Sequence, residues 1–146
     1  IVTSSSAETI LQQIPKDQKI IFGPDRHLGG YLSRKFNREM LLWPGVCIVH
    51  EAFSETELLK LKEKHPNAPV AAHPECPPTI VDHADYVGST SGILKFAEEF
   101  EGDTLIVAAK DNDRLVAYHD AMLELAKGTV GQGELGRVLS QSDFVA

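Results

Sequence analysis

Short apolar segments alternate along this chain with segments whose apolar residues recur every three or four positions. The apolar segments have the length of buried β-strands, which we expect at Lys19–Phe22, Met40–Trp43, Val70–His73, Tyr86–Gly88 and Thr104–Ala108. The amphipathic segments between them are long enough for helices. Strands that alternate with helices at this spacing predict an α/β fold of parallel βαβ units, in which helices cover both faces of the sheet in three αβα layers.

Capping signals predict where the helices begin. Ser5 with Glu8 and Ser54 with Glu57 have the spacing of capping boxes, in which each side chain satisfies a free backbone N–H. The first helix should run to about Ile14, and the second should end at Pro66. A third helix is expected from Ser91 to Phe100. A fourth is expected after Asp113, with one apolar face made by Leu115, Tyr118, Met122 and Leu125.

The proline-rich stretch Pro66–Pro69 predicts a boundary between two small, similar α/β units. Residues 1–68 would form the first unit and residues 69–128 the second. Residues 129–146 are rich in Gly and Ser, and carry only a weak helical pattern. The chain begins Ile1-Val2-Thr3 without Met, so we expect it to be a fragment or a processed chain.

Composition narrows the classes of function. The 146 residues are 42% hydrophobic and 24% charged, as in ordinary globular domains, and the formal net charge is −7. This charge argues against a nucleic-acid or anionic membrane surface. No apolar run has the length of a membrane span, and no signal peptide is evident. Two cysteines are too few for a disulfide scaffold, so we expect a cytoplasmic setting, or an organelle if a transit peptide precedes the chain.

The side chains with the richest chemistry follow predicted strands. Cys47 and His50 come after one strand, and His73, Glu75 and Cys76 come after the next. Ligands of α/β sheets gather at the carboxyl ends of strands, so these groups should meet in one crevice. Three interpretations stay open on the residues alone. The cysteines could be plain buried residues, the two Cys/His pairs could hold structural zinc, or the site could hold a cluster or catalytic metal.

Other polar residues suggest an anionic ligand and proton transfer. Ser89-Thr90-Ser91-Gly92 leads from a strand into a helix, and Thr3-Ser4-Ser5-Ser6 does the same at the first helix. Free N–H groups and hydroxyls at such starts can bind anions, although a plain helix cap explains each of them as well. Glu75 is a candidate general base beside a metal and an imidazole. Asp25 and His27 form a further pair that a helix cap with a solvated histidine would explain.

Several motifs together resemble the quinolinate synthase family. They include Trp43-Pro44-Gly45-Val46-Cys47-Ile48-Val49-His50-Glu51, His73-Pro74-Glu75-Cys76-Pro77 and Ala84-Asp85-Tyr86-Val87-Gly88-Ser89-Thr90-Ser91-Gly92. Val2-Thr3-Ser4-Ser5 and Pro24-Asp25-Arg26-His27-Leu28-Gly29 also agree with the family in order and spacing. The resemblance covers about residues 1–100. It implies three similar αβα domains around a pseudo-threefold axis.

The resemblance also implies an activity and a set of site residues. The family condenses iminoaspartate with dihydroxyacetone phosphate to quinolinate in NAD biosynthesis, using a four-iron four-sulfur cluster held by three cysteines. Cys47 would supply one of them, and Cys76 would be no ligand. Glu75 would be the general base, with His73 its neighbour in proton transfer and His50 near the cluster. Ser4, Ser89 and Thr90 would grip the carboxylate or phosphate of the substrates.

Departures from the family pattern lead to a second expectation. The first-domain motifs and two of the three family cysteines do not occur in this sequence, and the resemblance fades after about Glu101. We therefore expect the chain to need further domains or another chain to complete its site, and to be inactive alone. A truncated module that binds an anion or a partner, and a small zinc-binding domain, are the alternatives.

Overall fold

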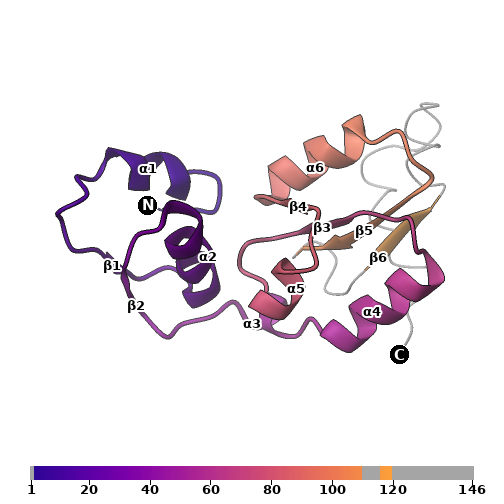
Figure 1. The fold of residues 1–146 in the computed structure, drawn as a ribbon, viewed down its shortest axis with the longest axis horizontal. Coiled ribbons are helices and arrows are strands. Elements are labelled where there is room, and N and C mark those ends of the chain that lie inside the picture. The colour runs from indigo at the N-terminus through magenta and orange to yellow at the C-terminus, as the bar shows by residue number, and fades with distance from the viewer. Residues whose placement is uncertain (1, 110–115, 120–146) are drawn as a thin grey trace.

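A computed structural model describes residues 2–109 and 116–119, which form two neighbouring groups of elements (Figure 1). The first group contains α1 (Ala7–Gln13), β1 (Ile21–Phe22), α2 (Arg26–Phe36) and β2 (Leu41–Leu42). The second contains α3 (Ile48–Glu51), α4 (Glu55–Lys64), β3 (Val70–Ala72), α5 (Pro78–Val81), β4 (Tyr86–Val87), α6 (Thr90–Glu99), β5 (Thr104–Ala108) and β6 (Val116–His119). No helix in these two ranges is long and apolar enough to cross a membrane.

The second group is built on a four-stranded sheet in the order β4-β3-β5-β6. Strand β3 runs parallel to β4 and β5, whereas β6 pairs antiparallel with β5. Residues alternate between the two faces. Val70 and Ala72 pack with α4 and α5 on one side, while Ala71 packs with α6 on the other. This group therefore has the predicted three αβα layers, with α6 above the strands and α4 and α5 below them (Figure 1).

The first group has a smaller parallel sheet, in which Ile21 pairs with Leu41 and Phe22 with Leu42. One face packs on the two helices, where Phe22 joins Leu28 and Leu32 in a core cluster. Ile21 and Leu41 point away from this core and are 77% and 68% exposed. Within the described residues, helices thus cover only one face of this sheet. The predicted parallel βαβ arrangement is confirmed in this group, but the predicted third layer is not observed there.

All five predicted strands occur, at or within one or two residues of their predicted ends, because each is a run of apolar residues.

The predicted helices at the two capping boxes also occur, but neither box forms. Helix α1 begins one residue later, after Ser6, and Glu8 pairs with Lys35 Nζ at 2.7 Å. Ser54 precedes α4 without a capping hydrogen bond from its side chain, and Glu57 pairs with Lys60. Helix α6 begins one residue earlier than predicted.

Four elements differ from the predictions, since the short helices α3 and α5 were not predicted and α2 and β6 differ as well. Helix α2 was not predicted, although Asp25 caps it by accepting a hydrogen bond from the Leu28 N–H. The predicted helix after Asp113 is wrong over Val116–His119, which forms β6. Pairing with β5 supplies backbone partners that override the helical pattern there. Met122 and Leu125 of that prediction, and the tail 129–146, lie outside the described residues.

The packing of α4 bears on the predicted boundary at residues 68 and 69. Phe53 and Leu58 are buried in the same cluster as Val70 and Ile80, so α4 contributes to the core of the second group. Tyr31 of α2 packs against this cluster and also against the core of the first group. The division into units at residue 68 stays a prediction, and the packing of Phe53 and Leu58 favours an earlier boundary, just before α3.

Candidate functional site

Cys47 stands at the start of the single-turn helix α3, and its carbonyl accepts the Glu51 N–H at 2.9 Å. The turn carries His50 inward, where only 1% of its surface is exposed. The Cys47 thiol is half-buried. Strand β2 and this short helix together position the Cys47 thiol and the His50 imidazole close to each other.

The turn after β3 carries a carboxylate, that of Glu75. The His73 N–H donates to the Ala108 carbonyl at 2.8 Å, which continues the pairing of β3 with β5 by one residue. The Cys76 N–H then donates to the His73 carbonyl at 2.9 Å and closes a tight turn. Glu75 lies at the tip of that turn, half-buried at the carboxyl end of the sheet. The strand-end position predicted for these residues is therefore observed.

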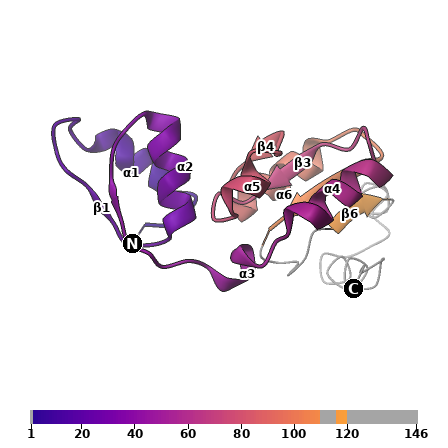
Figure 2. The ribbon, with the colours of Figure 1, turned by 60° about the horizontal axis from the view of Figure 1, so that its bottom comes forward.

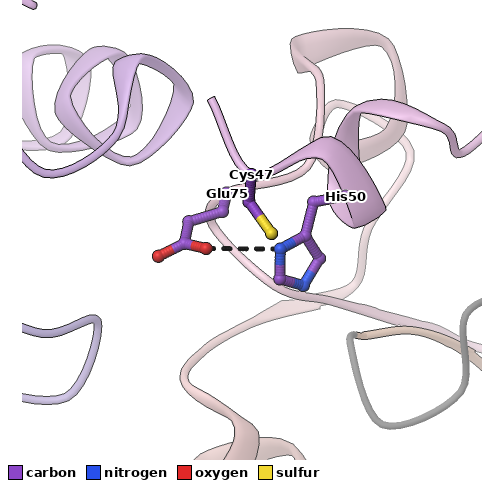
Figure 3. Close-up of side chains that lie close together, drawn as sticks. All are labelled: Cys47, His50 and Glu75. Carbon is purple, nitrogen blue, oxygen red and sulfur yellow. Dashed lines mark ion pairs between the residues drawn. The ribbon is translucent and has the colours of Figure 1, made fainter. Parts of the chain in front are cut away.

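The two segments meet (Figure 3). The Cys47 sulfur, a ring nitrogen of His50 and a carboxylate oxygen of Glu75 all lie within 4.8 Å of one another. His50 Nδ1 is 3.3 Å from Glu75 Oε2, and His73 Nδ1 is 4.0 Å from the same oxygen. The two imidazole rings stack with their centroids 4.4 Å apart and their planes 5° from parallel. A thiol, two imidazoles and a carboxylate thus share one site.

A hydroxyl from the other end of the chain also reaches this site. His73 Nε2 is 3.1 Å from Ser4 Oγ, a contact that joins residues 69 positions apart. The Glu75 N–H donates to His73 Nδ1 at 3.3 Å. Because Nδ1 accepts this bond, the ring proton of neutral His73 lies on Nε2, which then donates to Ser4. Ser4 is therefore placed beside the predicted catalytic group.

His50 carries a feature that suggests a ligand. Both of its ring nitrogens are buried, and neither makes a hydrogen bond with the described residues, although Nδ1 faces the Glu75 carboxylate. Leaving a buried polar atom unsatisfied costs about 1–3 kcal/mol. Imidazole and thiolate are both ligands of transition metals. A metal group that Cys47 binds beside His50 fits this donor set.

The remaining predicted hydroxyls stand at the neighbouring strand. The Gly88 N–H donates to the Ala72 carbonyl, so the end of β4 lies beside the end of β3. Ser89 caps α6 by accepting from the Gly92 N–H at 3.3 Å, and Thr90 is exposed at the first helical position. The role of both residues in substrate binding stays a prediction.

Cys76 lies outside the group of candidate ligands. Its side chain is 1% exposed, and its thiol donates to the Ala108 carbonyl across 3.5 Å. Burial raises the pKa of this thiol to about 12, against the opposing influence of the backbone bond to His73. A protonated, buried thiol is a poor metal ligand. The structure therefore offers little support for a zinc knuckle made of both Cys/His pairs.

Asp25 and His27 have contacts that the sequence interpretation missed. Asp25 caps α2, which agrees with the helix-cap interpretation, but its second oxygen accepts the Cys47 N–H at 2.8 Å. His27 is not solvated, since its side chain pairs with Glu51 at the end of α3. The sequence offered one signal for the second contact of Asp25. Ser or Asn would cap a helix equally well, so a carboxylate at this position indicates a further partner.

The fold and the site define an α/β protein with a candidate metal centre at the carboxyl ends of its strands. Comparison with known proteins gives the particular family. The family described as NadA, quinolinate synthetase A protein, matches residues 1–117. The chain belongs to this family, which confirms the resemblance seen in its motifs.

Individual relatives agree. The chain is 52% identical over 110 residues to a quinolinate synthase of Synechocystis sp., a match that covers 75% of this chain and 35% of that protein. It is 49% identical over 111 residues to that of Ehrlichia chaffeensis, covering 76% and 35%, and 48% identical over 110 residues to that of Trichodesmium erythraeum, covering 75% and 34%. The chain thus spans about a third of the length of the curated relatives it matches. The relatives are named as quinolinate synthases, and their family implies a four-iron four-sulfur cluster.

Proposed function

We propose that this chain forms part of a quinolinate synthase, which condenses iminoaspartate with dihydroxyacetone phosphate to quinolinate in NAD biosynthesis. The observation that carries the proposal is the meeting of Cys47, His50 and Glu75 within 4.8 Å, from two segments that the family motifs mark. With only two cysteines in the sequence, the cytoplasm is the expected location, or an organelle where a transit peptide directs the protein.

Cys47 is the proposed cluster ligand of this chain. Four-iron clusters are held chiefly by cysteine thiolates, and an iron with an open position can polarise a substrate oxygen as a Lewis acid. Cys76 is buried and protonated, so this chain offers a single suitable thiol. The other cysteine ligands would come from further domains or another chain.

Glu75 is the proposed general base, because its Oε2 faces two imidazole nitrogens at 3.3 and 4.0 Å. Condensation and ring closure require protons to be removed from carbon and delivered to leaving oxygens. A carboxylate can take such a proton, and neighbouring imidazoles can pass it on near neutral pH. His73 would exchange its Nε2 proton with Ser4, and His50 would hold Nδ1 toward the carboxylate.

The proposed substrates are anions, although the chain has a net charge of −7. Ser89 and Thr90 open α6, where free backbone N–H groups carry partial positive charge. Ser4 lies just before α1 and beside His73. These hydroxyls would bind a carboxylate or a phosphate by hydrogen bonds and so orient the substrate against Glu75.

The surface supports a site that is completed by further structure. Ile21, Leu41, Trp43 and Ile48 are large apolar side chains that are between 64% and 81% exposed. Three of them lie on or beside the sheet of β1 and β2, whose outer face carries no helix of the described residues. Exposed apolar groups of this kind mark surfaces that other protein normally covers.

A full-length chimera tests the proposal. The 110-residue segment of the Synechocystis enzyme that matches this chain would be replaced by the segment from this chain. After anaerobic reconstitution, the chimera should form quinolinate, whereas the isolated chain should not. Absence of turnover in a folded, cluster-bearing chimera would refute the proposed activity, and turnover by the isolated chain would refute the proposed incompleteness.

A zinc site is the second candidate, because a thiolate, an imidazole and a carboxylate within 4.8 Å also suit Zn²⁺. Metal analysis of aerobically purified chain separates the two proposals. One zinc per chain, lost on replacement of Cys47 or His50, would favour this reading. An anion-binding module without metal would instead still bind phosphate after Cys47 is replaced.

A further inference from the structure

The carboxylate of Asp25 is buried, with 3% of the residue exposed, and its two oxygens serve different elements. Oδ1 accepts the Leu28 N–H at 2.9 Å and caps α2. Oδ2 accepts the Cys47 N–H at 2.8 Å, 22 positions along the chain. One side chain therefore holds the start of a helix and the backbone of the proposed cluster ligand.

A helix cap alone does not require this residue. Asn and Ser cap helices about as well as Asp, and they bring no charge. Burying a carboxylate is costly unless hydrogen bonds satisfy it. The second backbone bond, to Cys47, is made by a second oxygen, Oδ2, which a capping serine lacks.

Neighbouring contacts also hold the segment around Cys47 in place. The Arg26 N–H donates to the Gly45 carbonyl at 2.8 Å, two residues before Cys47. The side chains of Arg26 and His27 both pair with Glu51, the last residue of α3. The turn from β1 into α2 thus contacts the segment from Gly45 to Glu51 before, at and after the cysteine. In Figure 2 this segment lies where the chain passes from the first group of elements to the second.

We propose that Asp25 is a positioning residue, which fixes the backbone of Cys47 and thereby aims its sulfur toward His50 and Glu75. Outer groups that hold metal ligands in place commonly contribute ten- to a hundredfold to metal affinity. The part of this inference that concerns the cluster rests on the proposed function. The part that concerns the Cys47 backbone does not.

The variant Asp25→Asn separates the two bonds. Its single amide oxygen can cap α2, while its NH₂ group would face the Cys47 N–H and cannot accept from it. Asp25→Ser is the second variant, because its hydroxyl can cap the helix but is too short to reach Cys47. Asp85→Ala is the matched control, since Asp85 Oδ2 accepts a different backbone N–H, that of Val70, at 2.8 Å.

The first measurement is amide hydrogen exchange, followed by NMR on the metal-free 146-residue chain. In Asp25→Asn and Asp25→Ser, the Cys47 amide should exchange at least about tenfold faster than in the wild type, while Leu28 keeps its protection. Asp85→Ala should leave the Cys47 amide unchanged. Unchanged exchange at Cys47 in both Asp25 variants would overturn the inference.

The second measurement is the rate at which a chelator removes iron from the reconstituted chimera. Asp25→Asn should lose its cluster about ten- to a hundredfold faster than the wild type, and the spectrum of the reduced cluster should shift. Wild-type retention in Asp25→Asn, beside loss in Cys47→Ala, would overturn the positioning role and leave the proposed function standing. Retention in Cys47→Ala would instead overturn the proposed cluster ligand.

Discussion

His50 Nδ1 lies 3.3 Å from Glu75 Oε2, although α3 carries the histidine and the turn after β3 carries the carboxylate. Each residue reaches this position because a different strand ends nearby. Parallel strands place their carboxyl ends along one edge, which makes that edge the usual place for a site. The pair therefore follows from the topology, and its chemistry can be tested one side chain at a time.

Replacing Glu75 should slow turnover strongly without releasing iron. In the chimera, Glu75→Gln keeps the shape of the side chain, but its amide cannot act as a base near neutral pH. The rate should fall by about 10²–10⁴. Steady-state assays and iron content measure the two effects separately. Glu57→Gln, in an exposed pair with Lys60, is the control and should keep full activity. Normal turnover in Glu75→Gln would remove Glu75 from the mechanism.

Replacing His50 should cost activity but little stability. His50→Leu removes two buried nitrogens that have no hydrogen bonds with the described residues, and nearly preserves the side-chain volume. Relief of this desolvation offsets the lost stacking on His73 and the lost pair with Glu75, so the free energy of unfolding should change by only about 0 to +1 kcal/mol. Urea denaturation of the metal-free chain measures it.

The matched control is His83→Leu, which breaks a half-exposed pair with Glu55 and should lower stability by at most about 1 kcal/mol. A loss of more than about 2 kcal/mol in His50→Leu would show that the imidazole has a structural role in the core.

The two cysteines should differ in reactivity. Burial raises the pKa of Cys76 to about 12, so only about one part in 10⁴ is thiolate at pH 8. Iodoacetamide, with sites identified by mass spectrometry, should label the half-buried Cys47 and leave Cys76 unmodified in the folded chain. Equal labelling of both thiols under native conditions would contradict the burial of Cys76.

The same pKa predicts a pH dependence of stability. The unfolded thiol loses its proton near its ordinary pKa of about 8.5, whereas the folded chain keeps it up to about pH 12. The contribution of Cys76 to stability is therefore complete below about pH 8.5 and falls as the pH rises toward 12. The stability difference between wild type and Cys76→Ala should shrink over this range. A constant difference would contradict the prediction.

Two adjacent glycines in α2 should respond in opposite ways to alanine. A Cβ at Gly29 would lie 2.6 Å from Leu42 Cδ2 and 2.8 Å from Phe22 Cδ1, whereas a Cβ at Gly30 meets nothing within 4 Å. Gly29→Ala should destabilise the chain by about 1–2 kcal/mol through overpacking. Gly30→Ala should stabilise it by about 0.5–1 kcal/mol through helix propensity. Thermal unfolding of both variants checks this, and equal shifts would refute the close packing of α2 on β1 and β2.

These glycines also explain why α2 could not be predicted. Two adjacent glycines lower helix propensity and resemble a turn, yet Gly29 is required because Phe22 and Leu42 approach so closely. Strand β3, in contrast, was predictable, because Val70 and its two alanine neighbours are apolar and buried on both faces. The strand at Val116–His119 was not, since its pairing with β5 is set by tertiary structure.

The candidate site was predictable only in outline. Strand-end positions indicated that Cys47 and Glu75 would be neighbours, and the family motifs named them. The contact of Ser4 with His73 and the bond from Cys47 to Asp25 join residues 69 and 22 positions apart. No local pattern encodes such pairs, because they depend on how the two groups of elements pack together.

The most direct test is the iron and sulfide content of the reconstituted chimera when each cysteine of this chain is replaced in turn. Cys76→Ala should retain about four irons per protein, because Cys76 lies in the core with its thiol directed at the Ala108 carbonyl. Cys47→Ala should lose the cluster and its absorption. A full cluster in Cys47→Ala, or its loss in Cys76→Ala alone, would contradict the assignment of Cys47 as the cluster ligand.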